Sequence, residues 1–168
     1  PVANGLVESL PRPGGNITGL TGVNEEVIPK QLEYLRSLAP KLSRVAVLVN
    51  PASMNRAEKL KHIHAAAKMP GVAILYLEAR TPQEIEHALS IMTGNKARAF
   101  IMASDPLFSQ QFRQIAELAL KHRLLSVSQS REYAEAGGLI TYGANSADMH
   151  RRAAAYVDKI FKGAKPGD

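Results

Sequence analysis

Apolar runs alternate with amphipathic stretches along most of this chain. The run 44–50 (RVAVLVN) holds five consecutive apolar residues, which is typical of a strand buried on both faces. Further strands are predicted at 72–77, 97–103, 124–127 and 139–142, with a short extra one at 17–20. The alternation of strands with helices favours an α/β fold, doubly wound around a mainly parallel, Rossmann-like five-stranded sheet with helices on both faces.

Helices are predicted where apolar residues recur every three or four positions. Their ranges are 27–38, 55–68, 82–94, 109–122, 131–136 and 146–161. Thr81 and Glu84 have the spacing of a capping box at the start of the third helix. In the second helix the expected buried stripe is Leu60, Ile63 and Ala67, and Lys59 and Lys61 are assigned to the surface. In the last helix the expected buried stripe is Met149, Ala153, Tyr156 and Ile160.

The strand order decides where a ligand would bind. If the order is 2-1-3-4-5, the first and third strands are neighbours and the helices after them cover opposite faces. Ligands of such sheets bind in the crevice at the carboxyl ends of these two strands, so segments 50–55 and 104–107 would meet there. Asn50, Ser53 and Asn55 offer neutral donors and acceptors, and Asp105 offers a carboxylate for a ligand amino group. These residue types are also preferred helix caps, which leaves capping by Asn55 or Asp105 as an equal alternative.

Composition narrows the function classes. The 168 residues include no cysteine, which excludes disulfides, thiol catalysis and cysteine-ligated zinc. No run of 18 apolar residues is present to span a membrane. The formal net charge of +6 comes from interspersed basic residues without interleaved aromatic ones, so no nucleic-acid partner is expected.

Sequence motifs of catalysis and cofactor binding are missing. The chain has no GxGxxG, no GxxxxGK[ST] and no GxSxG motif. His62 and His64 are two positions apart, so they face different sides of a helix and do not bind one metal ion together. We therefore expect no cofactor, no metal site and no enzymatic activity. The less favoured alternative is a small enzyme on a Rossmann-like fold with Asp105 or Glu132 as its base.

Five segments, in order along nearly the whole chain, resemble the bacterial ABC-transporter substrate-binding protein family with the periplasmic-binding-protein type 1 fold. They are 12–20 (RPGGNITGL), 44–51 (RVAVLVNP), 104–108 (SDPLF), 131–143 (REYAEAGGLITYG) and 154–166 (AAYVDKIFKGAKP). The resemblance implies two lobes joined by a hinge. Residues 1–23 would form a hinge crossover, 24–145 one ligand-binding lobe, and 146–168 a return helix that would normally pack on a first lobe missing from this chain. Within this chain the helix would pack on its own lobe or on another copy, or would stay partly exposed.

The resemblance also implies which residues face the ligand. They are Asn50, Ser53, Asn55, Asp105, Arg131, Glu132 and Asn145. Arg131 would meet a ligand carboxylate in a bidentate manner, or would instead pair with Glu132 or Glu135 at the surface.

By the same resemblance the protein is the solute-binding component of an ABC importer, which captures a small molecule by hinge closure. Its partners would be a small-molecule solute and an ABC permease, and the last helix would favour self-association. Its location would be periplasmic or extracytoplasmic, although the chain shows no signal sequence. A single lobe is expected to bind ligand weakly or not at all. The alternative from the same fold is a sensory or regulatory ligand-binding domain.

Overall fold

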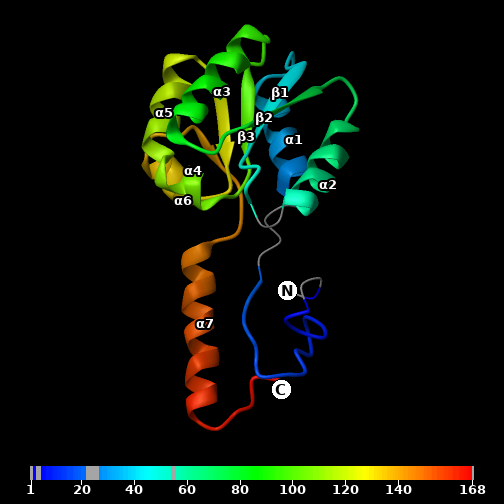
Figure 1. The fold of residues 1–168 in the computed structure, drawn as a ribbon, viewed down its shortest axis with the longest axis vertical. Helices are drawn as coiled ribbons and strands as arrows, with labels where there is room; N and C mark the ends of the chain where they lie inside the picture. The colour runs from blue at the N-terminus through cyan, green and yellow to red at the C-terminus, as the bar shows by residue number, and fades with distance from the viewer. Residues whose placement is uncertain (1, 3–4, 22–26, 54–55, 168) are drawn as a thin grey trace. The chain divides into compact units, whose positions relative to one another are not determined.

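A computed structural model describes residues 2, 5–21, 27–53 and 56–167 of the chain (Figure 1). The chain forms two compact units. The larger one is Val23–Ala144, and the smaller one combines Pro1–Gly22 with Asn145–Asp168. Each unit is described by itself below.

The larger unit is built on a five-stranded sheet in which every neighbouring pair of strands is parallel. The strand order β2-β1-β3-β4-β5 confirms the order assumed from the sequence, and with it the doubly wound α/β fold class. The strands are β1 (Arg44–Val49), β2 (Ala73–Glu78), β3 (Ala99–Met102), β4 (Leu125–Ser128) and β5 (Ile140–Thr141).

Six helices lie in the described part of this unit. They are α1 (Ile28–Leu38), α2 (Arg56–Ala67), α3 (Pro82–Gly94), α4 (Pro106–Gln110), α5 (Phe112–Lys121) and α6 (Arg131–Glu135). The single helix predicted over 109–122 is therefore wrong: α4 begins three residues earlier, and Gln111 separates it from α5 with φ −113° and ψ 16°. Periodicity misses the break because Phe108 and Ile115, on either side of it, are buried in one apolar cluster.

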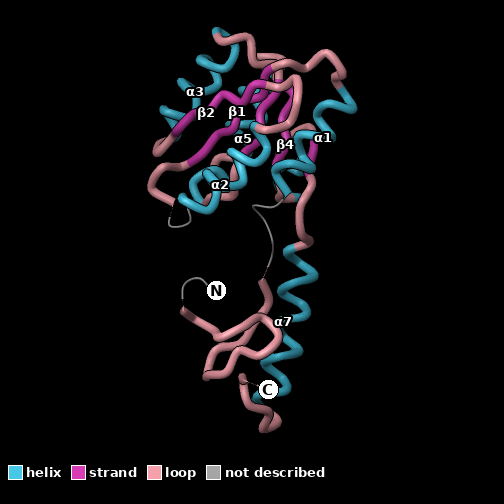
Figure 2. The backbone as a smooth tube through the Cα atoms, turned by 90° about the vertical axis from the view of Figure 1, so that its right-hand side faces the viewer, coloured by secondary structure: helices cyan, strands magenta, loops and turns pink. Residues whose placement is uncertain are grey.

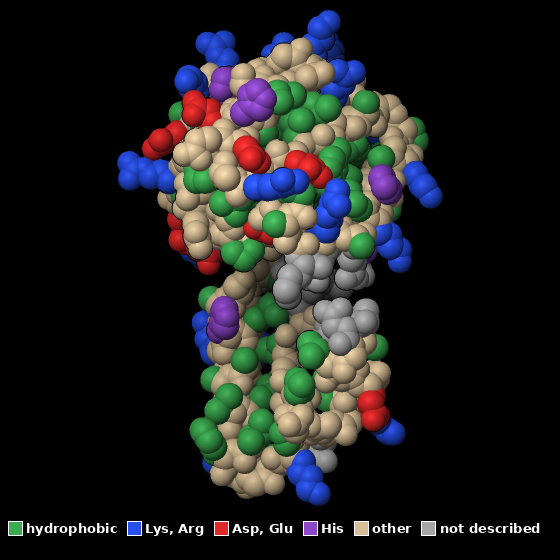
Figure 3. Space-filling model, in the orientation of Figure 1, with side chains coloured by type: hydrophobic (Ala, Val, Ile, Leu, Met, Phe, Trp, Pro, Cys, Tyr) green, Lys and Arg blue, Asp and Glu red, His purple; other side chains and the backbone are tan. Residues whose placement is uncertain are grey.

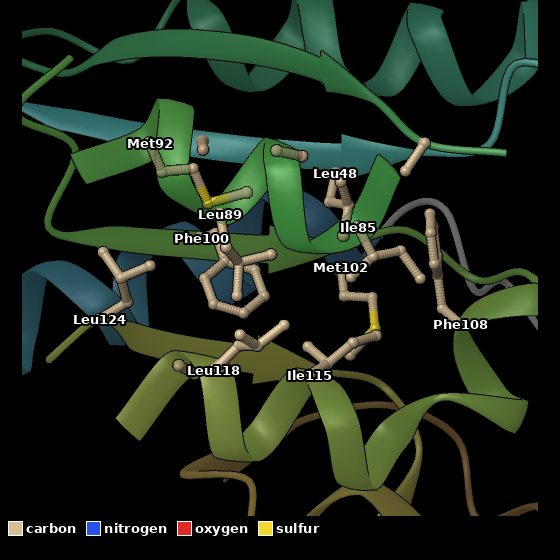
Figure 4. Close-up of a cluster of buried hydrophobic side chains, with 14 of the residues drawn as sticks. Leu48, Ile85, Leu89, Met92, Phe100, Met102, Phe108, Ile115, Leu118 and Leu124 are labelled. Atoms are coloured by element: carbon tan, nitrogen blue, oxygen red, sulfur yellow. The ribbon is translucent and has the colours of Figure 1, made fainter. Parts of the chain in front are cut away.

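Alternate residues of β1 pack on opposite faces of the sheet, as the pleat requires. Val45 and Val47 share an apolar cluster with side chains of α1 and α2, and Ala46 and Leu48 share the other with side chains of α3 and α5. Figure 4 shows the second cluster, where Phe100 and Met102 of β3 lie among residues of both helices. Helices therefore cover both faces, and those after β1 and β3 lie on opposite sides.

The buried stripe of α2 differs from the predicted one. Its buried residues include Lys59, Ile63 and Ala66 at positions i, i+4 and i+7. Leu60 is only half-buried and Ala67 is exposed. The helix is thus turned by about one position relative to the prediction, which places a lysine where an apolar side chain was expected.

The start of α3 follows the predicted cap with one change. Thr81 Oγ1 accepts a hydrogen bond from the Glu84 backbone N–H at 3.2 Å. The Glu84 carboxylate, however, accepts from the Arg80 backbone N–H at 2.8 Å rather than from Thr81. The first contact pairs a backbone donor that the helix start leaves open, and the second holds the residue before the cap.

The smaller unit contains α7 (Ser146–Phe161). Residues 5–21 run as loops and turns (Figure 2), so the short strand predicted at 17–20 is not formed. The prediction that α7 buries an apolar stripe is also wrong, because no residue of this helix is buried. Apolar side chains instead gather on its surface (Figure 3), with Val157 50% and Phe161 87% exposed. No described helix has the length and hydropathy to cross a membrane.

Candidate functional site

Two loops meet at the carboxyl edge of the sheet, after the adjacent strands β1 and β3. The strands run parallel, with Leu48 opposite Met102. The loop after β1 therefore starts beside the loop after β3. Asn50 and Asp105, one from each loop, are joined directly: Asn50 Nδ2 donates to Asp105 Oδ1 at 2.9 Å. The topology thus brings together two residues that were predicted from the sequence to share this edge.

Asp105 serves as a helix cap and as a buried polar group at once. Its Oδ1 also accepts a hydrogen bond from the Leu107 backbone N–H at 3.0 Å, at the start of α4. The side chain is only 5% exposed, and among the described residues its other oxygen, Oδ2, accepts no hydrogen bond. The nearest cation to Oδ2 is Lys59 Nζ, at 3.9 Å. One face of this carboxylate therefore keeps its acceptor capacity.

Lys59 is the residue at this edge that sequence reasoning missed. It projects from the first turns of α2, is only 6% exposed, and donates from Nζ to Ser53 Oγ at 2.6 Å. The same ammonium donates to the Ser104 carbonyl oxygen. Lys59 thus joins the loop after β1 to the loop after β3. Its spacing from Ile63 and Ala66, four and seven residues, is that of one helix face, and this spacing could have indicated its burial.

The loop after β1 is itself held by its first residue. Asn50 Oδ1 accepts a hydrogen bond from the Ala52 backbone N–H at 2.9 Å, and the Ser53 backbone N–H donates to the Asn50 carbonyl oxygen at 3.1 Å. These two contacts form a tight turn that presents the half-buried Ser53 hydroxyl to Lys59. Asn55, the remaining candidate of this loop, lies outside the described residues.

A small open pocket lies against Lys59. It is lined by Ile28, Gln31, Lys59, Met102, Ala103, Ser104 and Gln129. Buried Gln31, from the first turn of α1, donates to the Tyr142 carbonyl oxygen at 2.8 Å. This bond ties α1 to the residue that follows β5.

Arg131 and Glu132 follow β4 at the same edge of the sheet but make other contacts. Arg131 is 85% exposed and its Nε donates to Glu135 Oε1 at 3.1 Å, which is the surface pairing considered from the sequence. Glu132 accepts a hydrogen bond from the Ser130 hydroxyl, and this bond, with a backbone one, lowers its pKa. No hydrogen bond or ion pair within the described ranges connects either residue to Asp105 or Lys59.

Asn145 belongs to the smaller unit and caps α7. Its Oδ1 accepts a hydrogen bond from the Asp148 backbone N–H at 3.0 Å. In this structure its side chain therefore has the helix-capping role that asparagine often takes.

The polar groups at the carboxyl edge suit the binding of a charged organic ligand. Asp105 Oδ2 can accept from a ligand ammonium group, and the Ser53 hydroxyl, which accepts from Lys59, can donate its own proton to a ligand anion. Within the described residues no group of three acidic or histidine side chains is placed to hold a metal ion. An open parallel sheet with such an edge has the architecture of a ligand-binding α/β domain.

Comparison with known proteins places this domain in a family. The model of the family described as ABC transporter substrate binding protein matches residues 1–168, and the chain belongs to this family. A curated relative, the tyrosine-binding protein of Clostridioides difficile (strain R20291), is 24% identical over 168 residues. These residues are all of this chain but 48% of the relative, so the chain spans about half the length of that protein.

Solved structures of substrate-binding proteins share the fold. The ABC domain in complex with L-Trp from Streptococcus pneumonia matches with a TM-score of 0.84 and 23% identity, over 100% of this chain and 56% of that one. A ligand-free, open substrate-binding protein with adhesive properties from Clostridium difficile matches with a TM-score of 0.73 and 24% identity, over the same shares of the two chains. These likenesses establish the periplasmic-binding-protein fold.

Proposed function

We propose that this chain forms part of the solute-binding component of an ABC importer, and that its ligand is an amino acid. The observation that carries the proposal is Asp105, whose side chain is only 5% exposed and whose Oδ2 accepts no hydrogen bond from the described residues. A carboxylate oxygen that accepts no hydrogen bond from the described residues can accept one from a ligand. The α-ammonium group of an amino acid is such a donor.

The relatives support this ligand class. One is a tyrosine-binding protein and another was solved in complex with L-Trp, so an aromatic amino acid is the ligand we propose to test first. Such substrate-binding proteins are not enzymes, which fits a binding role for Asp105 without catalysis.

We propose that the ligand is captured between two lobes. Residues 24–145 form one lobe, 1–23 the hinge crossover, and 146–168 the return helix that packs on the other lobe. The open pocket beside Lys59 lies at the same edge of this lobe. Closure would bring the opposite lobe over Asn50, Ser53, Asn55 and Asp105. Arg131, Glu132 and Asn145 remain candidates for contacts made only in the closed form.

The same proposal gives the protein its partners and location. It works outside the cytoplasmic membrane, in the periplasm or an equivalent extracytoplasmic space, and delivers the solute to an ABC permease. The exposed apolar surface of α7 supports self-association of the 168-residue chain.

Isothermal titration calorimetry of the complete gene product with the twenty amino acids tests the proposal. We expect an aromatic amino acid to bind with micromolar affinity or better, and the 168-residue chain alone to bind far more weakly. Asp105→Asn should weaken binding by about tenfold or more, because a charge-assisted hydrogen bond is lost. Glu117→Gln, at an exposed position of α5, is the matched control and should bind like the wild type. Absence of binding by every amino acid, or unchanged affinity of the Asp105→Asn variant, would overturn the proposal.

A further inference from the structure

Lys59 and Asp105 form a buried pair of opposite charges at the carboxyl edge of the sheet. Their side chains are 6% and 5% exposed, and Lys59 Nζ lies 3.9 Å from Asp105 Oδ2. This separation is too long for a hydrogen bond but close enough for strong charge interaction in a buried setting. The charge of Asp105 is therefore already balanced before any ligand arrives.

A ligand that carries only a positive charge would disturb this balance. If its ammonium group binds Asp105 Oδ2, a second cation joins Lys59 beside this carboxylate. Like charges in a desolvated site repel each other strongly. A ligand that also carries a carboxylate restores neutrality, because its negative charge compensates the additional cation.

Ser53 offers a place for that carboxylate. Its Oγ accepts a hydrogen bond of 2.6 Å from Lys59 Nζ, so its own proton points away from the lysine and has no acceptor among the described residues. A hydroxyl that accepts from a cation is a stronger donor, since the hydrogen bonds of such a chain polarise one another. The hydrogen bond from Lys59 thus makes the Ser53 hydroxyl a better donor to an anionic group on the open side of the site.

We propose that Lys59 is a specificity-determining residue that makes this site select zwitterionic amino acids and reject the corresponding amines. Asp105 Oδ2 receives the ammonium group, and the Lys59–Ser53 pair receives the carboxylate. This inference rests on the proposed function, because it requires the ligand amino group to bind Asp105. It goes further by assigning the selection against amines to a residue that is buried beneath the site.

Competition between L-tyrosine and tyramine tests the inference in the complete gene product. Tyramine has the ammonium group and the ring of tyrosine but no carboxylate; L-tryptophan and tryptamine form the equivalent pair if tryptophan is the tighter ligand. The wild type should prefer the amino acid by about 100-fold or more, because tyramine lacks the charge-assisted contact at Ser53 and leaves two cations beside Asp105, each effect worth about tenfold. Lys59→Met should reduce this preference by about tenfold or more. Lys61→Met, at an exposed position of the same helix, should leave the preference unchanged.

Ser53→Ala keeps the test decisive if the Lys59→Met variant does not fold. It leaves the Lys59–Asp105 pair in place and removes the polarised hydroxyl, so it should also lower the preference for the amino acid over the amine. A parallel loss of affinity for both ligands in these variants would mean that Lys59 only holds the two loops together, and would overturn the inference. If the wild type binds no amino acid, the proposed function itself fails, which is a separate and recognisable result.

Discussion

Asn50 Nδ2 donates a hydrogen bond of 2.9 Å to Asp105 Oδ1 and thereby joins the ends of the two central strands of the sheet. The two residues are 55 positions apart in the chain. With Asn50 and the Leu107 backbone N–H both on Oδ1, the carboxylate is held in one orientation and its second oxygen faces Lys59. Asn50 thus orients the group that we propose binds the ligand amino group.

Replacement of Asn50 should destabilise the larger unit in a way that depends on pH. Asn50→Ala removes both side-chain contacts of this residue and should lower the free energy of unfolding by about 1–3 kcal/mol. Asn50→Asp should be more harmful near neutral pH, because it places a second carboxylate against Asp105, and this difference should shrink in acid as one carboxyl group takes up a proton. Urea unfolding at several pH values measures both effects. Variants as stable as the wild type at every pH would show that the contact does not matter.

Gly138 should tolerate no side chain. A Cβ atom built on it would overlap the fully buried ring of Tyr133. Gly138→Ala should therefore lower the free energy of unfolding by about 1–3 kcal/mol or more through overpacking. Gly94→Ala is the control: no atom lies within 4 Å of its added Cβ, and it should be neutral or stabilising by about 1 kcal/mol because alanine favours helix. Thermal unfolding of both variants checks the contrast.

The hydroxyl of Tyr133 gives a prediction for alkaline pH. Burial raises the pKa of this side chain from 10.0 to about 12, although the neighbouring Ser126 offsets part of the rise. Ser126 does not form a well-aligned hydrogen bond to the hydroxyl, which has no partner among the described residues. Because the pKa in the folded protein lies above the ordinary value, this tyrosine contributes its full stability below pH 10.0. That contribution is lost as the pH rises through about 12.

Tyr133→Phe removes the unpaired hydroxyl and this titration together. Near neutral pH we expect the variant to be as stable as the wild type or more stable by up to about 1 kcal/mol. Its advantage should grow between pH 10 and 12, by at most about 1.4 kcal/mol for each pH unit. Urea unfolding of both proteins across this range gives the difference. A variant that is clearly less stable at neutral pH would indicate that the hydroxyl has a partner.

The apolar surface of α7 predicts concentration-dependent association of the 168-residue chain. Val157 and Phe161 are 50% and 87% exposed, and their burial between copies would favour assembly through the hydrophobic effect. Replacement of both by serine should weaken association by about tenfold or more, since each large apolar side chain contributes about 1.5–3 kcal/mol when fully buried. Sedimentation equilibrium measures the association constant. Arg152→Ser, an exposed polar position on the same helix, should leave it unchanged, and a monomeric wild type would contradict the prediction.

Most of the sheet could be predicted from the sequence, because a strand buried on both faces is visible as a continuous run of apolar residues. β1 appears as an unbroken apolar run because both of its faces are covered, and Val45–Val49 are all buried. Helix boundaries were less predictable: Gln111 ends α4 without a glycine or proline to mark the break. The stripe of α7 also follows a helical period, yet no residue of that helix is buried, because a period shows which side is apolar and not whether another element covers it.

The sequence by itself determined that Asn50 and Asp105 follow buried parallel strands, and hence that both lie at one edge of the sheet. This follows because parallel strands share their carboxyl edge whatever their side chains are. Only the tertiary structure decided that Lys59 is buried there and joins Ser53 to Ser104. The orientation of α2 about its own axis depends on packing against α1 and β2. A lysine on a short helix is compatible with either solvent or a buried partner. The direction of the Lys59 side chain is therefore decided by the packing of the whole domain.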